Sequence, residues 1–314
     1  MIRKIVLGAA AVCTAGIVVL VLVLAPVTAR ETAATPALWK IDGPQGDIYL
    51  FGSIHILPKG TNWRRPDLEA ALQQAQRLTF EVNMDEAMNP STSVGLVTQY
   101  GFLPADKSLK KMLAPDYRAK LDEVIASLGL PPAGVDRMRP WLAAMTITSL
   151  SIVKQNTPEG KPLDPSALTT GELAGVDMQL WNAGKAAGKE LGALETIEDQ
   201  LRVFADLPED KQVELLVSTL KEVSRPKAAI DQLLNAWKKG DTAALERNMF
   251  DEMEDFPALR KAVFYDRHVK WLPQIERMMA DGKTHVIVVG AGHLVGKDSV
   301  VAMLRAKGIR VEGP

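Results

Sequence analysis

Two histidines stand at equivalent places near opposite ends of this sequence of 314 residues. His55 ends the segment Gly-Ser-Ile-His at 52–55, and His293 ends Gly-Ala-Gly-His at 290–293. Each motif follows or completes a short, apolar, β-branched run that predicts a strand buried on both faces. With 23 glycines and 4 histidines, chance alone would give about 0.3 Gly-x-x-His matches. The pair therefore indicates a functional site, although either histidine alone fits an ordinary hydrogen-bonded residue at a strand end.

Two glutamates occupy comparable places. Glu81 lies inside the predicted strand Arg77–Asn83, where a carboxylate is costly unless it is paired, protonated or bound to a metal. Glu195 ends the predicted strand Lys189–Glu195, just before a helix. More ordinary interpretations stay open for both residues. Glu81 could point outward from an edge strand, and Glu195 could simply favour the positive end of the following helix.

A further cation lies on an amphipathic helix near the carboxy terminus. Counting 100° per residue places Arg267 at the edge of an apolar stripe and His268 in the middle of that stripe. A guanidinium that borders a core face indicates an anionic partner, although the long side chain could equally reach solvent. We therefore count Arg267 among the candidate catalytic residues.

The elements that position these side chains are predicted as alternating strands and helices. The chain opens with a hairpin of two strands, a helix with proline in its first turn, and a third strand: Ala37–Ile41, Asp47–Ile56, Pro66–Ala75 and Arg77–Asn83. Strand, helix, strand is a crossover unit, which favours parallel pairing in a covered sheet. The chain closes with the second Gly-x-x-His strand, a helix, and a last strand at Gly308–Val311.

Helices and helix breakers fill about 90–175, with no convincing strand, and helices also dominate 208–282. We interpret the first of these regions as a large helical insertion that covers a site or grips a substrate. The predicted fold is mixed α/β (α+β): a central, mostly parallel sheet flanked by helices, in one domain over 37–314.

The four residues His55, Glu81, Glu195 and His293 can converge, because ligands of open α/β sheets bind outside the carboxyl ends of the strands. Two imidazoles and one carboxylate are a familiar ligand set for a divalent metal with an open water position. We expect His55, His293 and Glu81 to bind Mn, Co or Zn, and Glu195 to act as general base. The metal would acidify its water and polarise a carbonyl. Ligation requires neutral imidazoles, so binding should weaken at low pH.

The amino terminus predicts export. A basic start, Met1–Lys4, precedes the uncharged segment Ile5–Ala29, which ends in small residues of the kind signal peptidase accepts. The same segment is close to the length that spans a bilayer, so an uncleaved membrane anchor stays open. We predict a signal peptide or anchor at 1–29, a linker at 30–36, and a periplasmic, secreted or membrane-anchored domain.

The amino-acid composition limits the partners and the reactions that this protein can have. A net charge of −1 gives no reason to expect nucleic acid as a partner. The one cysteine, Cys13, lies in the apolar amino-terminal segment, so the exported part has neither a thiol nucleophile nor disulfides. The sequence contains no Gly-x-Ser-x-Gly motif, which would indicate a serine nucleophile. Metal-assisted hydrolysis remains, with a peptide or protein as the expected substrate.

Together, the motifs resemble those of the TraB/PrgY/GumN family, which is also grouped with the Tiki metalloproteases. The resemblance covers roughly 38–311. The residues that carry it are Phe51-Gly-Ser-Ile-His55, Thr79-Phe-Glu-Val82, Gly175-Val-Asp177, Leu194-Glu-Thr196 with Gln200, Asp266-Arg267, and Gly290-Ala-Gly-His-Leu294 with Gly296. It implies an α/β fold with a metal site of histidines and glutamates and, in the Tiki branch, metal-dependent protease activity. The family often has asparagine after the arginine, whereas His268 stands here and could be an extra ligand.

Two rival functions were weighed. A nucleotide-binding loop at 290–297 is rejected, because the Walker pattern requires glycine at Ala291 and serine or threonine at Asp298. A non-catalytic protein that binds a peptide or another ligand in the same pocket stays the alternative to a metallopeptidase.

Overall fold

The structure is a computed structural model. It describes residues 34–55, 57, 60–157, 161, 164, 175–223 and 227–314. The predicted signal peptide or anchor at 1–29 lies outside the described residues. Within the part that is described, no helix is both long and apolar enough to cross a membrane.

One five-stranded sheet forms the centre of the fold, in the order β1-β2-β5-β3-β4. The strands are β1 (Leu38–Ile41), β2 (Ile48–Ser53), β3 (Arg77–Phe80), β4 (Glu190–Ala193) and β5 (His285–Gly290). β1 and β2 form an antiparallel hairpin, and all other neighbours are parallel. The predicted mixed α/β fold with a mostly parallel sheet is confirmed, as is the opening hairpin.

The crossover from β2 to β3 does not join neighbouring strands. Helix α2 (Pro66–Gln74) connects them, but β5, from the other end of the chain, lies between β2 and β3 and pairs with both. Every residue of β5 is buried. Its apolar residues suit the middle of a sheet that is covered on both faces. The strand that leads to His293 is thereby placed between the strands that lead to His55 and Glu81.

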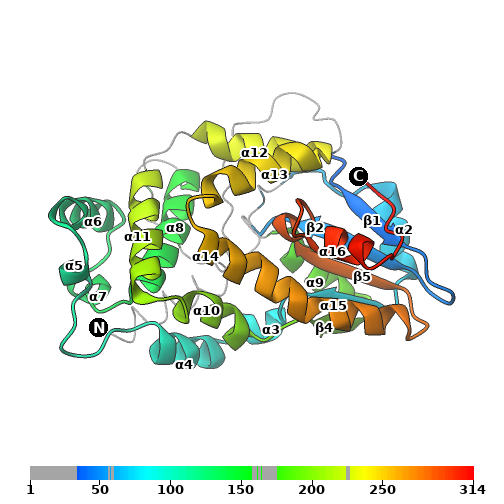
Figure 1. Cartoon of the computed structure of the whole chain (residues 1–314), viewed down its shortest axis with the longest axis horizontal. Coiled ribbons are helices and arrows are strands. Elements are labelled where there is room, and N and C mark those ends of the chain that lie inside the picture. The colour runs from blue at the N-terminus through cyan, green and yellow to red at the C-terminus, as the bar shows by residue number, and fades with distance from the viewer. Residues whose placement is uncertain are drawn as a thin grey trace.

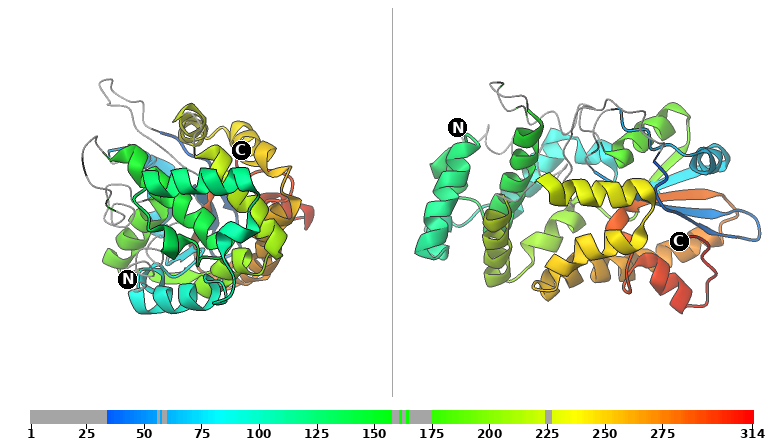
Figure 2. Two further views of the ribbon diagram at one scale, coloured as in Figure 1. Left: turned by 90° about the vertical axis from the view of Figure 1, so that its left-hand side faces the viewer. Right: turned by 90° about the horizontal axis from the view of Figure 1, so that it is seen from above.

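Helices cover both faces of the sheet (Figures 1 and 2). α2 and α9 (Val176–Ala186) lie on one face, and α15 (Asp266–Met279) and α16 (Val300–Ala306) lie on the other. A Cβ added to Gly184 of α9 would lie 2.5 Å from a methyl group of Leu78, so the glycine permits close packing on β3. Thr79, the next residue of β3, faces α15, where its hydroxyl lies 4.0 Å from the sulfur of Met278.

Most of the remaining helices lie to one side of the sheet (Figure 1). They are α3 (Met84–Ala87), α4 (Pro90–Tyr100), α5 (Leu109–Met112), α6 (Pro115–Ser127), α7 (Pro132–Val135), α8 (Pro140–Asn156), α10 (Ile197–Ala205), α11 (Glu209–Glu222), α12 (Lys227–Lys239), α13 (Thr242–Phe250) and α14 (Pro257–Arg260). α8 packs along α11. Between 90 and 157 the chain is helical, as predicted, and its β-structure there is limited to an isolated bridge between Phe102 and Met138.

One predicted strand was wrong at its carboxyl end, and another was wrong altogether. β3 stops at Phe80, so Glu81 follows the strand instead of lying inside it. The reason is that the carbonyl of Glu81 accepts hydrogen bonds from the backbone N–H groups of Leu194 and Glu195, where the chain leaves β4 for α10. Gly308–Val311 is not a strand either. The nearby pairing is an isolated bridge between Lys40 and Glu312.

Gly175 provides a test of how α9 docks on the sheet. A Cβ on Gly175 would lie 2.2 Å from the carbonyl oxygen of His55, and this neighbour is backbone, which cannot rotate away. We expect Gly175→Ala to reduce the free energy of unfolding by about 1–3 kcal/mol through overpacking. Urea denaturation measures the change.

Gly95 offers the matched control. It lies exposed within α4, and an added Cβ would meet no atom within 4 Å. Gly95→Ala should be neutral, or stabilising by up to about 1 kcal/mol, because alanine lowers the entropy of the unfolded chain. Equal losses of stability in the two variants would contradict the proposed close approach of α9 to His55.

Candidate active site

The four polar residues that follow strands lie beyond one edge of the sheet. Glu81 comes directly after β3, His55 and Glu195 come shortly after β2 and β4, and His293 lies in the 3₁₀ turn η4 (Ala291–His293) after β5. Because these strands are parallel, their carboxyl ends share that edge. The topology therefore brings together side chains that are distant in the sequence.

Three of these side chains meet around Gly290. A Cβ on Gly290 would lie 3.2 Å from Glu81 Oε1, 3.3 Å from His55 Nε2 and 3.5 Å from His293 Cδ2. Glu81 Oε1 accepts the Gly290 N–H at 2.6 Å and lies 3.5 Å from His293 Nε2. The glycine of the second Gly-x-x-His motif is thus required for space, because any side chain would fill the region that the three groups face.

His55 is oriented by Asp177, in the first turn of α9. Asp177 Oδ2 lies 3.2 Å from His55 Nδ1, which directs Nε2 toward Gly290. Among the described residues, His55 Nε2 and Asp177 Oδ1 are buried atoms without a hydrogen-bond partner. Burial lowers the pKa of His55, but the Asp177 carboxylate, supported by Glu81, outweighs this effect and raises the pKa to about 9.

Arg267 lies between the two glutamates and is 3% exposed. Its Nη2 donates to Glu81 Oε2 at 2.5 Å and to Glu195 Oε1 at 2.6 Å, and its Nε lies 3.1 Å from both Glu195 oxygens. Its Nη1 donates to the Val263 carbonyl at 3.2 Å and to His293 Nε2 at 3.0 Å. A guanidinium has five N–H donors, and these contacts use all of them.

The contact with Arg267 fixes the tautomers of two histidines. Arginine can only donate, so His293 Nε2 must accept, and His293 Nδ1–H then donates to His268 Nε2 at 2.8 Å. His268 Nδ1–H in turn donates to the Asp298 carbonyl at 2.7 Å. Burial lowers the pKa of His293 well below its usual value and that of His268 to about 4. Both rings are therefore neutral, and His268 orients His293 instead of facing Gly290 itself.

The buried charges do not balance. Glu81 and Glu195 pair with the one guanidinium, and Asp177 pairs with His55. When the three carboxylates are ionised and His55 is protonated, one negative charge is in excess, and loss of the His55 proton raises the excess to two. Burial opposes ionisation of Glu81, but Arg267, the two histidines and the Gly290 N–H outweigh this and lower its pKa. Burial raises the pKa of Glu195, while Arg267 opposes that shift. A cation that entered beside Gly290 would restore neutrality.

Several site residues were not among the sequence candidates. Asp177 and Gln200 appeared only as parts of motifs, yet Asp177 orients His55, and Gln200 Nε2 donates to Glu81 Oε2 at 3.0 Å. Trp271 lies buried on the same helix as Arg267, and its Nε1–H donates to Glu195 Oε2 at 3.0 Å. The amino end of α9 meets the end of β2 only in the folded chain, so no local pattern in the sequence could have assigned Asp177 to His55.

The donors are of the right kind for a divalent metal, but Arg267 holds one of them. Two imidazoles and a carboxylate face Gly290, and His55 Nε2 is unpartnered in the described part of the chain. The lone pair of His293 Nε2 is engaged by Arg267, so ligation through that atom requires this hydrogen bond to be released. Consistently, the described residues contain no group of three such donors already spaced to hold a metal ion.

Comparisons with curated proteins gave distant relatives. The chain is 25% identical to the uncharacterized protein YbaP of Escherichia coli over 262 residues, which is 82% of this chain and 88% of that protein. It is 22% identical to the metalloprotease TIKI1 of Danio rerio over 328 aligned positions, covering 88% of this chain and 62% of that protein. A metalloprotease TIKI homolog of Amphimedon queenslandica is 23% identical, with 87% and 60% covered.

The chain thus spans less than two thirds of the length of these Tiki proteins. No solved structure matches it significantly. The sequence model of the TraB/PrgY/gumN family matches residues 37–313, which include every residue of the site described above. This chain therefore belongs to the TraB/PrgY/gumN family.

Proposed function

We propose that this protein is a divalent-metal-dependent hydrolase of peptide or amide bonds, with His55, Glu81 and His293 as the residues that hold the metal. The observation that carries the proposal is the meeting of these three donors around Gly290, in a buried site with an excess of negative charge. The similarity to Tiki metalloproteases supports the same class of chemistry.

A bound divalent cation would supply Lewis acidity, polarising the substrate carbonyl and acidifying a water molecule. In the reaction, water adds to the amide carbon, the C–N bond breaks, and the products are a carboxylic acid and an amine. One proton of the water passes through a general base to the leaving nitrogen. Asp177 keeps His55 Nε2 directed at the site, and His268 does the same for His293.

Glu195 is our candidate for the general base, and Arg267 for the group that steadies a substrate carboxylate or the developing oxyanion. In the structure both are engaged with each other. All Arg267 donors have partners, and the Glu195 oxygens accept from Arg267 and Trp271. Either role therefore requires this pair to open when substrate binds. If the pair stays closed, the two residues act by holding Glu81 in position.

The saturated network around Arg267 also favours a second candidate function. A buried polar network whose members are all satisfied is rigid. A rigid pocket of this kind also suits a protein that binds a peptide or another ligand without cleaving it. Turnover separates the two functions, and metal binding alone does not.

The proposed setting is outside the cytoplasm, in the periplasm, in the medium or at the membrane. This proposed location is based on the basic residues and the apolar segment within residues 1–29. The proposed partner is a peptide or protein substrate, in line with the similarity to Tiki metalloproteases.

Metal binding is tested by titration of chelator-stripped protein with Mn, Co and Zn. We expect His55→Ala with His293→Ala to weaken binding by more than the roughly 10- to 100-fold that loss of an outer partner of a ligand typically costs. His285→Asn is the control, because His285 is equally buried but lies at the other end of β5, paired with Asp281. Equal affinities of wild type and the double variant would exclude the proposed site.

Metal affinity should increase as the pH rises from neutral toward 9. Without metal, His55 has a raised pKa of about 9, so ligation at neutral pH displaces a proton. The dissociation constant should therefore fall, by up to about tenfold per pH unit, as the pH rises toward 9. Asp177→Asn removes the main cause of the raised pKa and should flatten this slope between pH 7 and 9. A slope that is unchanged in this variant would argue against His55 as the titrating ligand.

Catalysis is tested by digestion of a peptide library with added Mn or Co. Glu195→Gln should reduce turnover by about 10² to 10⁴ and largely retain metal affinity if Glu195 is the general base. His55→Ala should lose both. A Glu195→Gln variant that instead loses metal affinity and stability would assign Glu195 to positioning. Cleavage that persists in both variants would indicate another site or a contaminant.

A further inference from the structure

Ser53 carries a buried hydroxyl whose role the proposed function leaves open. It is the last residue of β2 and is 2% exposed. Within the described residues, its Oγ has no hydrogen-bond partner. Buried polar groups are normally paired, and an unpaired hydroxyl is costly. A group of this kind at a site indicates a partner that comes from outside the protein.

The register of the sheet places Ser53 beside the three donors. Ser53 is paired with Gly290 across β2 and β5. Paired residues of neighbouring strands direct their side chains to the same face, with the strands about 4.8 Å apart. The Ser53 hydroxyl is therefore adjacent to the space at Gly290, which Glu81 Oε1 and His55 Nε2 also face.

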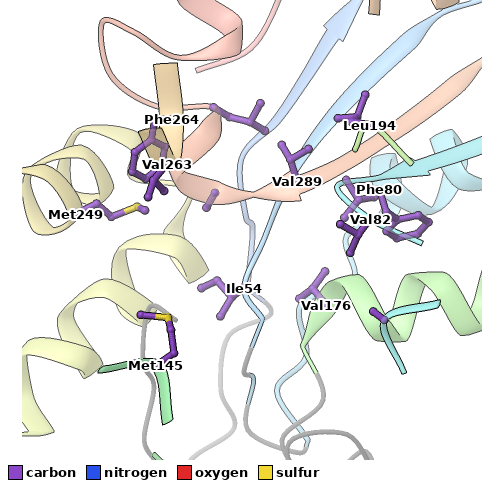
Figure 3. Packing of buried hydrophobic residues seen from close by; sticks show 14 of the residues in the cluster. Ile54, Phe80, Val82, Met145, Val176, Leu194, Met249, Val263, Phe264 and Val289 are labelled. Carbon is purple, nitrogen blue, oxygen red and sulfur yellow. The ribbon is translucent and has the colours of Figure 1, made fainter. Parts of the chain in front are cut away.

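A small cavity adjoins this position. It measures about 20 Å³, and Ser53, His55 and His293 line it together with apolar residues. Ile54, Met249 and Phe264 are among the apolar residues (Figure 3). A volume of roughly 10–15 Å³ or more is enough for a water molecule that has polar partners. Ser53 Oγ, from a residue that lines this cavity, has no partner in the described chain and can bind a water molecule there, whereas His55 Nε2, also unpartnered, is the atom assigned to the metal.

We propose that Ser53 is a positioning residue that holds the attacking water of the hydrolytic site in this cavity. This inference rests on the proposed function. The hydroxyl can accept a hydrogen bond from the water, which leaves a lone pair of the water oxygen free to face a substrate carbonyl beside Gly290. The apolar neighbours leave few competing polar partners for the water.

The test compares Ser53→Ala with Ser53→Thr, which retains the hydroxyl. We expect Ser53→Ala to lower kcat about tenfold, the loss expected for one neutral hydrogen bond in the transition state. KM and the affinity for Mn should stay unchanged. The melting temperature should stay equal or rise, because the hydroxyl that is removed has no protein partner in the described structure. Ser53→Thr should retain most of the turnover.

Ser149→Ala is the matched control. Ser149 lies on α8, is 1% exposed and, like Ser53, has a hydroxyl without a partner among the described residues. Its replacement should leave both kcat and the melting temperature close to those of the wild type.

The outcomes separate this inference from the proposed function. If the wild type cleaves peptides and Ser53→Ala cleaves them equally fast, the proposal for Ser53 fails and the proposed function stands. If Ser53→Thr is as slow as Ser53→Ala, or if Ser53→Ala loses stability and metal affinity, the hydroxyl does not act by positioning water. If the wild type shows no turnover with any metal, both proposals fail.

Discussion

The site depends on one buried arginine. Arg267 is paired with Glu81 and Glu195, and all three side chains are about 95% buried. Removing one partner from a buried ion pair typically costs about 3–5 kcal/mol, because the remaining charge is left without compensation. The same guanidinium fixes the tautomer of His293 and, through it, that of His268. Arg267 thus determines both the charge and the hydrogen-bond directions of the site.

This arrangement has a consequence for metal binding. Arg267 already supplies positive charge to Glu81 and occupies the lone pair of His293 Nε2. The three carboxylates of the site outnumber its positive groups, so the site can attract a divalent cation, but the cation must compete with a guanidinium for one ligand. Asp177 pairs with His55 Nδ1, and His55 Nε2 has no hydrogen-bond partner among the described residues. In the described structure, His55 Nε2 can therefore accept a ligand directly, whereas His293 Nε2 is already hydrogen-bonded to Arg267.

The sheet, the helical region and the residues at the strand ends could be predicted from the sequence, because short apolar runs and helix breakers are local signals. The position of β5 between β2 and β3 was not predicted, since pairing across more than 200 residues leaves no local trace. Helical periodicity placed Arg267 at the edge of a buried face, but it could not say which strand ends that face covers. His268 was considered as an extra ligand for the same reason. The Nδ1–H of His268 donates to the Asp298 carbonyl, and a pattern of residue types cannot reveal a contact with a backbone group.

We propose that His55, Glu81 and His293 together bind a divalent cation beside Gly290. Diffraction from crystals soaked with Zn²⁺, measured at the zinc absorption edge, would locate the cation. We expect an anomalous peak about 2.0–2.2 Å from His55 Nε2 and from a Glu81 oxygen, with His293 as a further ligand and Arg267 withdrawn from it. A peak bound elsewhere, or no peak with Arg267 still hydrogen-bonded to His293, would contradict this proposal.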